Sequence, residues 1–224
     1  MRKLTKSFIF CVILLSHFLS AKAAERKPDP DYIFFLHNKF LEENALDALH
    51  IEYGKSAYNE ILDTFRKDGF VVFSEKRPAK TDVRKYALKV ISQIDSLLNV
   101  GVKANHITII GTSKGGYIAQ YISTYMANPD LNFVFIGSFR NADITNYPEI
   151  NFCGNILTIY EKSDEYGVSA LKRKENSTLK INHFKEIELT TNLKHGFLYR
   201  NLDLWVNPCK MWAKRNYELK PKVH

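Results

Sequence analysis

A serine lies at the apex of a glycine-rich turn in the segment Gly-Thr-Ser-Lys-Gly-Gly, residues 111–116. A run rich in β-branched residues, 107–110, precedes the turn, and helical spacing of apolar residues follows it. This order predicts a strand, a sharp turn and a helix, with glycines that let the backbone turn tightly without a Cβ clash. The N–H groups that follow Ser113 then lie at a helix N-terminus, where a developing anion is stabilised. Ser113 is therefore a candidate nucleophile.

Two later loops supply the residue types that a serine nucleophile needs. Asp164 and His195 each follow a predicted strand. Serine is a poor nucleophile without a neighbouring imidazole to accept its proton. The imidazole in turn needs a carboxylate that fixes its tautomer and stabilises its charged form. Glu161 and Glu165 are alternatives to Asp164, which fits the usual spacing from the strand better.

Three other histidines are weaker candidates for the base. His183 and His106 each precede a predicted strand, which places them at the opposite edge of a parallel sheet. His50 lies in an early loop, and we expect it to be a surface residue. His195 is therefore the preferred base.

The apolar pattern predicts strands and helices that alternate along the chain. The predicted strands are 32–36, 70–73, 107–110, 133–136, 156–160 and 185–189. The predicted helices are 56–67, a helix capped by Thr81 or Asp82 that ends at Gly101, 115–126, a short one at 171–174, and 202–215. This alternation predicts βαβ units and a mostly parallel sheet covered on both faces. Functional groups of such sheets gather beyond the carboxyl ends of the strands.

The Gly-x-Ser-x-Gly turn, followed along the chain by an acid and then a histidine, resembles the nucleophile elbow and triad order of the α/β-hydrolase superfamily. The resemblance covers roughly residues 31–215. It implies an α/β-hydrolase fold, a mostly parallel twisted sheet with helices on both faces. It also implies a catalytic triad of Ser113, His195 and Asp164 that needs no cofactor. No cluster of residues has metal-ligand spacing, so we expect no metal.

The resemblance further implies two backbone donors for an oxyanion. One is the N–H of Lys114, and the second comes from the loop after the first strand, where we favour Lys39. This loop, residues 36–40, resembles a His-Gly-x turn with Asn38 in the place of the glycine. Asparagine tolerates the left-handed conformation better than most residues. We expect His37 to be structural, bonded to neighbouring loops.

Members of this superfamily often carry a cap domain after the strand that follows the elbow helix. Residues 139–154, a stretch of only 16 residues, make up most of the connection between the two predicted strands here. We therefore expect no large cap domain and a site open to small or accessible esters. Arg77, Arg140 and Lys114 fall near strand ends. We expect solvated surface charges there, with recognition of an anionic substrate as the alternative.

Residues 1–23 are predicted to be a secretory signal peptide. They combine a basic start, an apolar run over residues 8–15 and an Ala-x-Ala site at 21–23. The run is too short to span a bilayer comfortably, so membrane contact is expected only before cleavage. Cleavage leaves residues 24–224 as a single α/β-hydrolase domain. The sequence thus predicts a secreted or periplasmic protein.

The net charge bears on the kind of partner, and the cysteines bear on a possible disulfide. The formal net charge is +8, and the four positive charges of residues 1–23 leave +4 on the rest, spread along the chain. This excess does not favour a nucleic-acid partner. Cys153 and Cys209 either form a disulfide or are two buried thiols. The oligomeric state is left open.

The leading interpretation is a secreted serine hydrolase that acts on a small carboxylic ester through an acyl-enzyme. Peptidase, thioesterase or dienelactone-type activity would use the same residues. The second interpretation is a non-catalytic binding protein, because a fold does not fix a function. The presence of Ser113, Asp164 and His195 in the order of the superfamily argues against the second interpretation.

Overall fold

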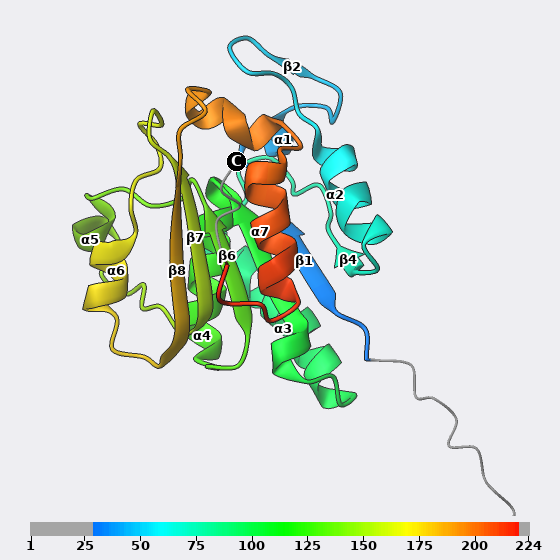
Figure 1. Ribbon diagram of the computed structural model, residues 1–224, viewed down its shortest axis with the longest axis vertical. Coiled ribbons are helices and arrows are strands. Elements are labelled where there is room, and N and C mark those ends of the chain that lie inside the picture. Colours follow the sequence, from blue (N-terminus) through cyan, green and yellow to red (C-terminus); the bar gives the residue numbers. More distant parts are fainter. Residues whose placement is uncertain (1–28, 220–224) are drawn as a thin grey trace, which may run out of the picture.

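The structure is a computed structural model that describes residues 29–219 (Figure 1). The predicted signal peptide lies outside the described residues and remains a prediction. Within residues 29–219, no helix is long and apolar enough to cross a membrane.

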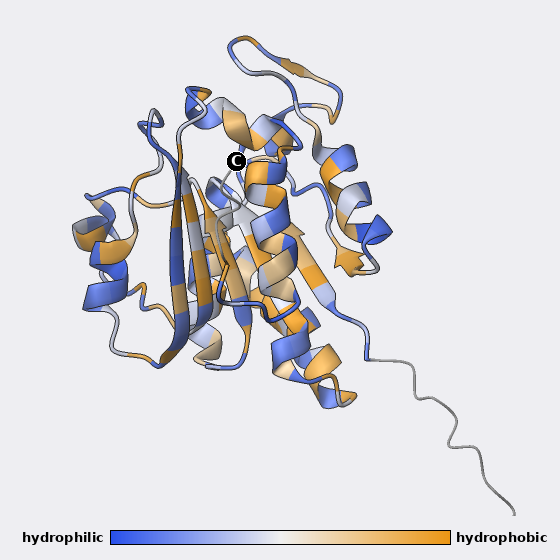
Figure 2. Ribbon diagram, viewed as in Figure 1, coloured by the Kyte–Doolittle hydropathy of each residue, from blue (hydrophilic) through white to orange (hydrophobic). Residues whose placement is uncertain are grey.

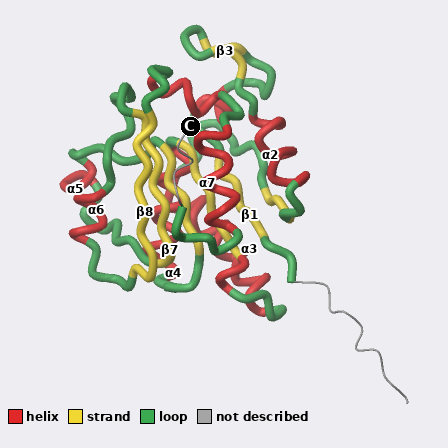
Figure 3. Tube along the Cα trace, viewed as in Figure 1, coloured by secondary structure: helices red, strands yellow, loops and turns green. Residues whose placement is uncertain are grey.

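A six-stranded parallel sheet forms the centre of the protein (Figures 1 and 3). In spatial order its strands are β4 (Val71–Phe73), β1 (Tyr32–Leu36), β5 (Ile107–Thr112), β6 (Asn132–Ile136), β7 (Gly154–Glu161) and β8 (Ile181–Leu189). The three strands β5, β6 and β7 are almost entirely buried, which explains why their sequences are mostly apolar and do not alternate strictly between apolar and polar residues. The edge strand β8 is half-exposed and carries hydrophilic segments (Figure 2).

Side chains alternate between the two faces of each strand and build two separate cores. On β1, Ile33 and Phe35 point to one core and Phe34 to the other. On β6, Val134 belongs to the first core and Phe133 to the second. Both faces of the sheet are therefore covered, which confirms the predicted architecture.

Helices cover both faces of the sheet (Figures 1 and 3). Helices α2 (Tyr58–Lys67) and α7 (Asp203–Ala213) pack in the first core, and α3 (Val83–Asn99) and α4 (Lys114–Met126) pack in the second. Asp82 caps α3, as predicted, by accepting a hydrogen bond from the Lys85 N–H. The short helices are α1 (Phe40–Glu43), α5 (Asp143–Asn146), α6 (Leu171–Asn176), η1 (Ala104–His106) and η2 (Lys194–Tyr199).

The structure adds elements that the periodicity did not predict. Helix α1 follows β1 directly, and an antiparallel hairpin of β2 (Leu49–His50) and β3 (Gly54–Lys55) follows α1. These segments, like α5, are too short to show a helical or strand period. Strand β8 begins at Ile181, so His183 lies inside this strand rather than before it. No cap domain is inserted within residues 29–219, and Cys153 and Cys209 are buried free thiols.

The packing of α7 gives a test of the first core. Trp205 is fully buried, whereas its neighbour Leu204 is largely exposed. Replacing a buried tryptophan with alanine costs about 3–5 kcal/mol, so we expect Trp205→Ala to lower the free energy of unfolding by about this amount. Leu204→Ala, the matched control, should change it by less than about 0.5 kcal/mol. Urea denaturation measures both, and equal effects would contradict this account of the core.

Candidate functional site

The sheet order brings the predicted site loops to one edge. Strand β5 ends at the nucleophile turn and lies between β1 and β6, so the loops after these strands flank Ser113. Strands β7 and β8 follow on the same side as β6. In register, Leu36 pairs with Gly111 and Glu161 pairs with Leu189, so the strands end level with one another. The carboxyl edge of the sheet therefore holds Ser113, Asp164 and His195 and the two predicted oxyanion donors.

The turn at Ser113 is strained and tightly packed. Ser113 has φ +51° and ψ −119°, which is unusual for a residue with a side chain. Its N–H donates to the Ile136 carbonyl of β6 at 2.8 Å. A Cβ at Gly111 would lie 2.3 Å from the Gly115 oxygen, and a Cβ at Gly115 would lie 2.0 Å from the Leu36 oxygen. The glycines of the motif thus permit close backbone contacts, as the sequence predicted.

A chain of hydrogen bonds joins the three predicted residues. Asp164 Oδ2 accepts from His195 Nδ1 at 2.6 Å, and His195 Nε2 lies 3.0 Å from Ser113 Oγ. The Asp164 side chain is fully buried, and its Oδ1 accepts the Tyr166 N–H at 2.9 Å. The structure therefore brings Ser113, His195 and Asp164 together in the order that the sequence predicted.

Glu161, an alternative acid in the sequence, has a different position. Its buried carboxylate accepts hydrogen bonds from Ser163 in its own loop and from Thr191 and Asn192 in the loop after β8. Burial alone would raise the pKa of Glu161, but the hydrogen bonds from Thr191 and Ser163 hold it below its ordinary value. Glu161 therefore ties the Asp164 loop to the His195 loop.

The predicted oxyanion donors lie at the N-terminal ends of two helices. Lys114 is the first residue of α4, and Lys39 is the residue before α1. Among the hydrogen bonds of residues 29–219, neither backbone N–H has an acceptor. Asn38 does not adopt the left-handed conformation expected for the glycine of a His-Gly-x turn. Its side chain instead accepts the Leu41 N–H at 3.3 Å, which stabilises the start of α1.

His37 is structural, as predicted. Its Nε2 accepts the backbone N–H of Arg77 at 2.9 Å, so in the neutral ring Nδ1 carries the proton and donates to the Asn38 oxygen at 2.7 Å. Burial and the charge of Arg77 lower the pKa of His37 to about 4. The imidazole is therefore neutral at pH 7 and joins the loops after β1 and β4.

The expectation of solvated surface charge is wrong for two of the three basic residues near the strand ends. Arg77 is fully buried and donates from Nε to Glu42 Oε1 at 2.7 Å. The Lys114 side chain is mostly buried and donates to Glu42 Oε2 at 2.6 Å. Arg140 is half-exposed beside Asp143. Sequence analysis did not single out the buried Glu42, because α1 is too short to show which of its faces is buried.

The hairpin β2–β3 packs beside the site, and sequence analysis missed it. Tyr53 lies against Gly196, where a Cβ would meet its Cδ1 at 2.8 Å. His50, which we expected at the surface, is partly buried, and its ring stacks on that of Tyr53 with centroids 4.4 Å apart. The half-exposed Tyr166, in the loop after β7, meets the His195 ring edge to face, with the ring centroids 5.4 Å apart. Two tyrosines thus lie close to His195 or to its neighbour.

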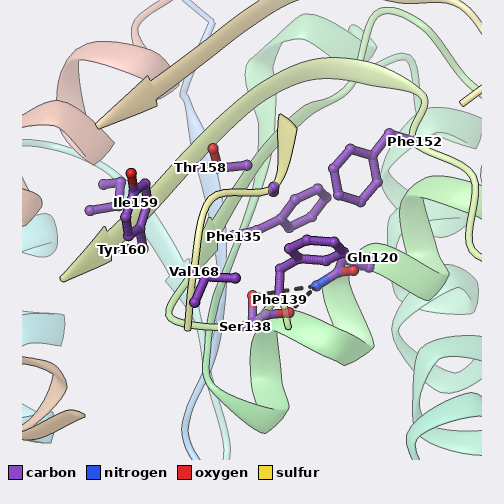
Figure 4. Close-up of a pocket in the computed structure, with 10 residues that line it drawn as sticks. Gln120, Phe135, Ser138, Phe139, Phe152, Thr158, Ile159, Tyr160 and Val168 are labelled. Atoms are coloured by element: carbon purple, nitrogen blue, oxygen red, sulfur yellow. Dashed lines mark hydrogen bonds between the residues drawn. The ribbon is translucent and has the colours of Figure 1, made fainter. Parts of the chain in front are cut away.

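A small pocket lies on the α4 side of β6 and β7 (Figure 4), and Ser113 is not among the residues that line it. The rings of Phe135, Phe139 and Phe152 line it, and the Gln120 amide donates to the Ser138 carbonyl at 2.6 Å. Its water-accessible volume is about 10 Å³, enough for about one water molecule. This pocket is too small for a substrate.

Two of the weaker base candidates, His106 and His183, lie at the far edge of the sheet, as predicted. His106 ends η1 beside Asp31, and His183 bonds to the Asn155 side chain and stacks on Tyr217. Within the part of the chain that the structure describes, no group of three His, Cys, Asp or Glu residues is arranged to hold a metal ion.

Several solved structures with a similar fold are named as hydrolases. SOBER1 from Arabidopsis thaliana matches with a TM-score of 0.54 at 16% identity, over 84% of this chain and 99% of SOBER1. A dienelactone hydrolase from Anabaena variabilis matches with a TM-score of 0.54 at 11% identity, over 84% and 86% of the two chains. Mouse α/β hydrolase domain-containing protein 10 matches with a TM-score of 0.50 at 12% identity, over 83% and 88%. No protein-family model and no curated protein sequence matches this chain.

These likenesses and the parallel sheet together define an α/β-hydrolase fold, as the sequence resemblance implied. At identities of 11–16%, they establish the fold and not a reaction.

The neutral state of His37 predicts acid sensitivity. Because the pKa of His37 is about 4 in the folded chain and about 6.5 when unfolded, only the unfolded chain binds this proton between those values. Stability should therefore fall as the pH falls from about 6.5 towards 4, by about 3 kcal/mol from this residue. Urea denaturation across this range measures the slope. His37→Gln should flatten it, and an unchanged slope would contradict the assignment.

Proposed function

We propose that this protein is a serine hydrolase that acts on a carboxylic ester or a related acyl substrate. The observation that carries the proposal is the hydrogen-bond chain from Asp164 through His195 to Ser113, at 2.6 and 3.0 Å. The proteins of similar fold that are named as hydrolases support the same class of reaction.

In this proposal each residue has one role. His195 Nε2 accepts the proton of Ser113 as Oγ attacks the acyl carbon, and the carbonyl electron pair moves onto oxygen. Asp164 holds Nδ1–H and stabilises the imidazolium. The N–H groups of Lys114 and Lys39 bind the oxyanion. The intermediate collapses, and the leaving alkoxide takes the proton from His195. Water then cleaves the acyl-enzyme by the same steps.

The surroundings of the site favour small or accessible substrates. No cap domain covers the sheet edge within residues 29–219, and the hairpin β2–β3 and Tyr166 lie beside Gly196 and His195 instead. Arg77 pairs with Glu42, and the half-exposed Arg140 lies beside Asp143, so both arginines already have a carboxylate partner. We propose a neutral acyl substrate. Thioesters and activated amides would use the same residues.

A non-catalytic binding protein of this fold is the alternative function. It would not need Ser113, His195 and Asp164 at hydrogen-bonding distance, so the observed geometry favours catalysis. We also propose that residues 1–23 direct export, so that the enzyme acts in a periplasm or outside the cell.

Labelling with a fluorophosphonate tests the nucleophile. Activated serines displace fluoride from this reagent, so the purified protein should gain one adduct by intact mass. Ser113→Ala should gain none, and its hydrolysis of p-nitrophenyl acetate should fall by at least about 10³-fold. Ser96→Ala is the control, because Ser96 is exposed on α3 and bonds only to the Ser92 carbonyl.

The two outcomes separate the two functions. One adduct on the parent and on Ser96→Ala, with none on Ser113→Ala, supports the hydrolase. A folded parent that takes up no label and hydrolyses no ester would contradict the hydrolase and favour the binding protein.

A further inference from the structure

A buried ionic cluster adjoins the two candidate oxyanion donors. Its members are Glu42 on α1, Arg77 after β4 and Lys114 at the start of α4. The Glu42 side chain is fully buried, and its two oxygens accept from Arg77 Nε at 2.7 Å and from Lys114 Nζ at 2.6 Å. One carboxylate therefore joins the segment that follows β1 to the nucleophile turn.

Arg77 also holds the backbone that leads to the Lys39 N–H. Its Nη2 donates to the His37 carbonyl and, at 3.4 Å, to the Asn38 carbonyl. No described peptide bond is cis, and in a trans peptide the C=O and N–H point in opposite directions. Holding the Asn38 carbonyl on the guanidinium side therefore turns the Lys39 N–H away from Arg77.

We propose that Glu42 and Arg77 are positioning residues that fix the backbone N–H groups of Lys39 and Lys114 relative to each other as an oxyanion hole. The inference rests on the proposed function, because it requires an oxyanion to form at Ser113. Both side chains are buried, so they act through the backbone and not by touching the substrate. Their effect belongs to the transition state, in which charge develops on the acyl oxygen.

The charge balance of the cluster supports this role. Two cations meet one carboxylate, so the three groups together carry a net positive charge, and one of the cations belongs to Lys114, whose N–H is one of the two donors. Burying three charged groups is costly, and apolar side chains often replace such clusters without loss of stability. Apolar side chains form no directional hydrogen bonds, so they cannot hold the His37 and Asn38 carbonyls at a set angle.

Glu42→Gln is the first test. Glutamine keeps the size of the side chain but turns one of the two oxygens into an NH2 donor, so the acceptor of either Arg77 or Lys114 is lost. We expect kcat for p-nitrophenyl acetate to fall by about 10- to 100-fold, with KM changed by less than about twofold. The matched control is Glu43→Gln, at the next position of α1, where a half-exposed carboxylate pairs with the Lys39 side chain at 3.5 Å. Its kcat should stay within about twofold of the parent.

Two further variants make the test independent of how well Glu42→Gln folds. Lys114→Met removes one side of the cluster at a partly exposed side chain and keeps the backbone N–H. We expect its kcat to fall by about tenfold at unchanged KM. Arg77→Lys keeps the charge but cannot reproduce the fork that reaches Glu42 and the two carbonyls. It should lose kcat to the same extent as Glu42→Gln, and thermal unfolding shows which variants fold.

Each outcome decides the matter. Folded variants with parental kcat, a loss confined to KM, or full activity in Arg77→Lys would overturn the positioning role and leave the proposed function intact. If Glu42→Gln does not fold, Lys114→Met decides by the same criteria. A parent that neither reacts with fluorophosphonate nor hydrolyses ester overturns the proposed function, and this inference with it.

Discussion

The site depends on one contact of backbone against backbone, where the start of α4 lies on the end of β1. A methyl group at Gly115 would lie 2.0 Å from the Leu36 oxygen, and one at Gly111 would lie 2.3 Å from the Gly115 oxygen. Only glycine permits such close backbone contacts at these two positions, and the chain between Gly111 and Gly115 therefore turns sharply. Ser113 adopts a conformation that costs about 1–3 kcal/mol, and the two cores of the sheet stabilise the fold against this cost. The same contact brings Lys114 beside the loop that carries Lys39.

Parallel strands align the loops at one edge, but sheet hydrogen bonds end where the loops begin. Two buried carboxylates join the loops beyond that point. Glu161 bonds the loop of Asp164 to the loop of His195, and Glu42 bonds Arg77, which holds the loop after β1, to Lys114. A hydrogen bond to a charged group contributes about 1.5–3 kcal/mol, enough to hold short loops in one arrangement. Binding residues commonly lie on loops that a rigid scaffold positions in this way.

Much of the fold follows from the sequence because its signals are local. The apolar runs of β5 and β6 and the glycines around Ser113 specify a strand, a turn and a helix within a few residues. The order of Ser113, Asp164 and His195, each after a strand, was enough to predict that the three side chains meet, because parallel strands end at one edge. The hairpin β2–β3 escaped prediction, since two-residue strands have no period.

The sequence could not show which charges are buried. Arg77 lies in a charged stretch that is typical of a surface loop, yet it is fully buried. Its partners, Glu42 and the carbonyls of His37 and Asn38, come from a distant segment, so the local sequence does not reveal the burial. Such clusters are weak evidence for stability, since desolvation offsets their attraction. What such clusters provide is directional hydrogen bonds, and the bond between His37 and Arg77 depends on the protonation state of His37. The His37 ring accepts a hydrogen bond from the Arg77 backbone only while Nε2 carries no proton. The pKa of about 4 that burial gives to His37 therefore keeps the loop of Lys39 in place at neutral pH.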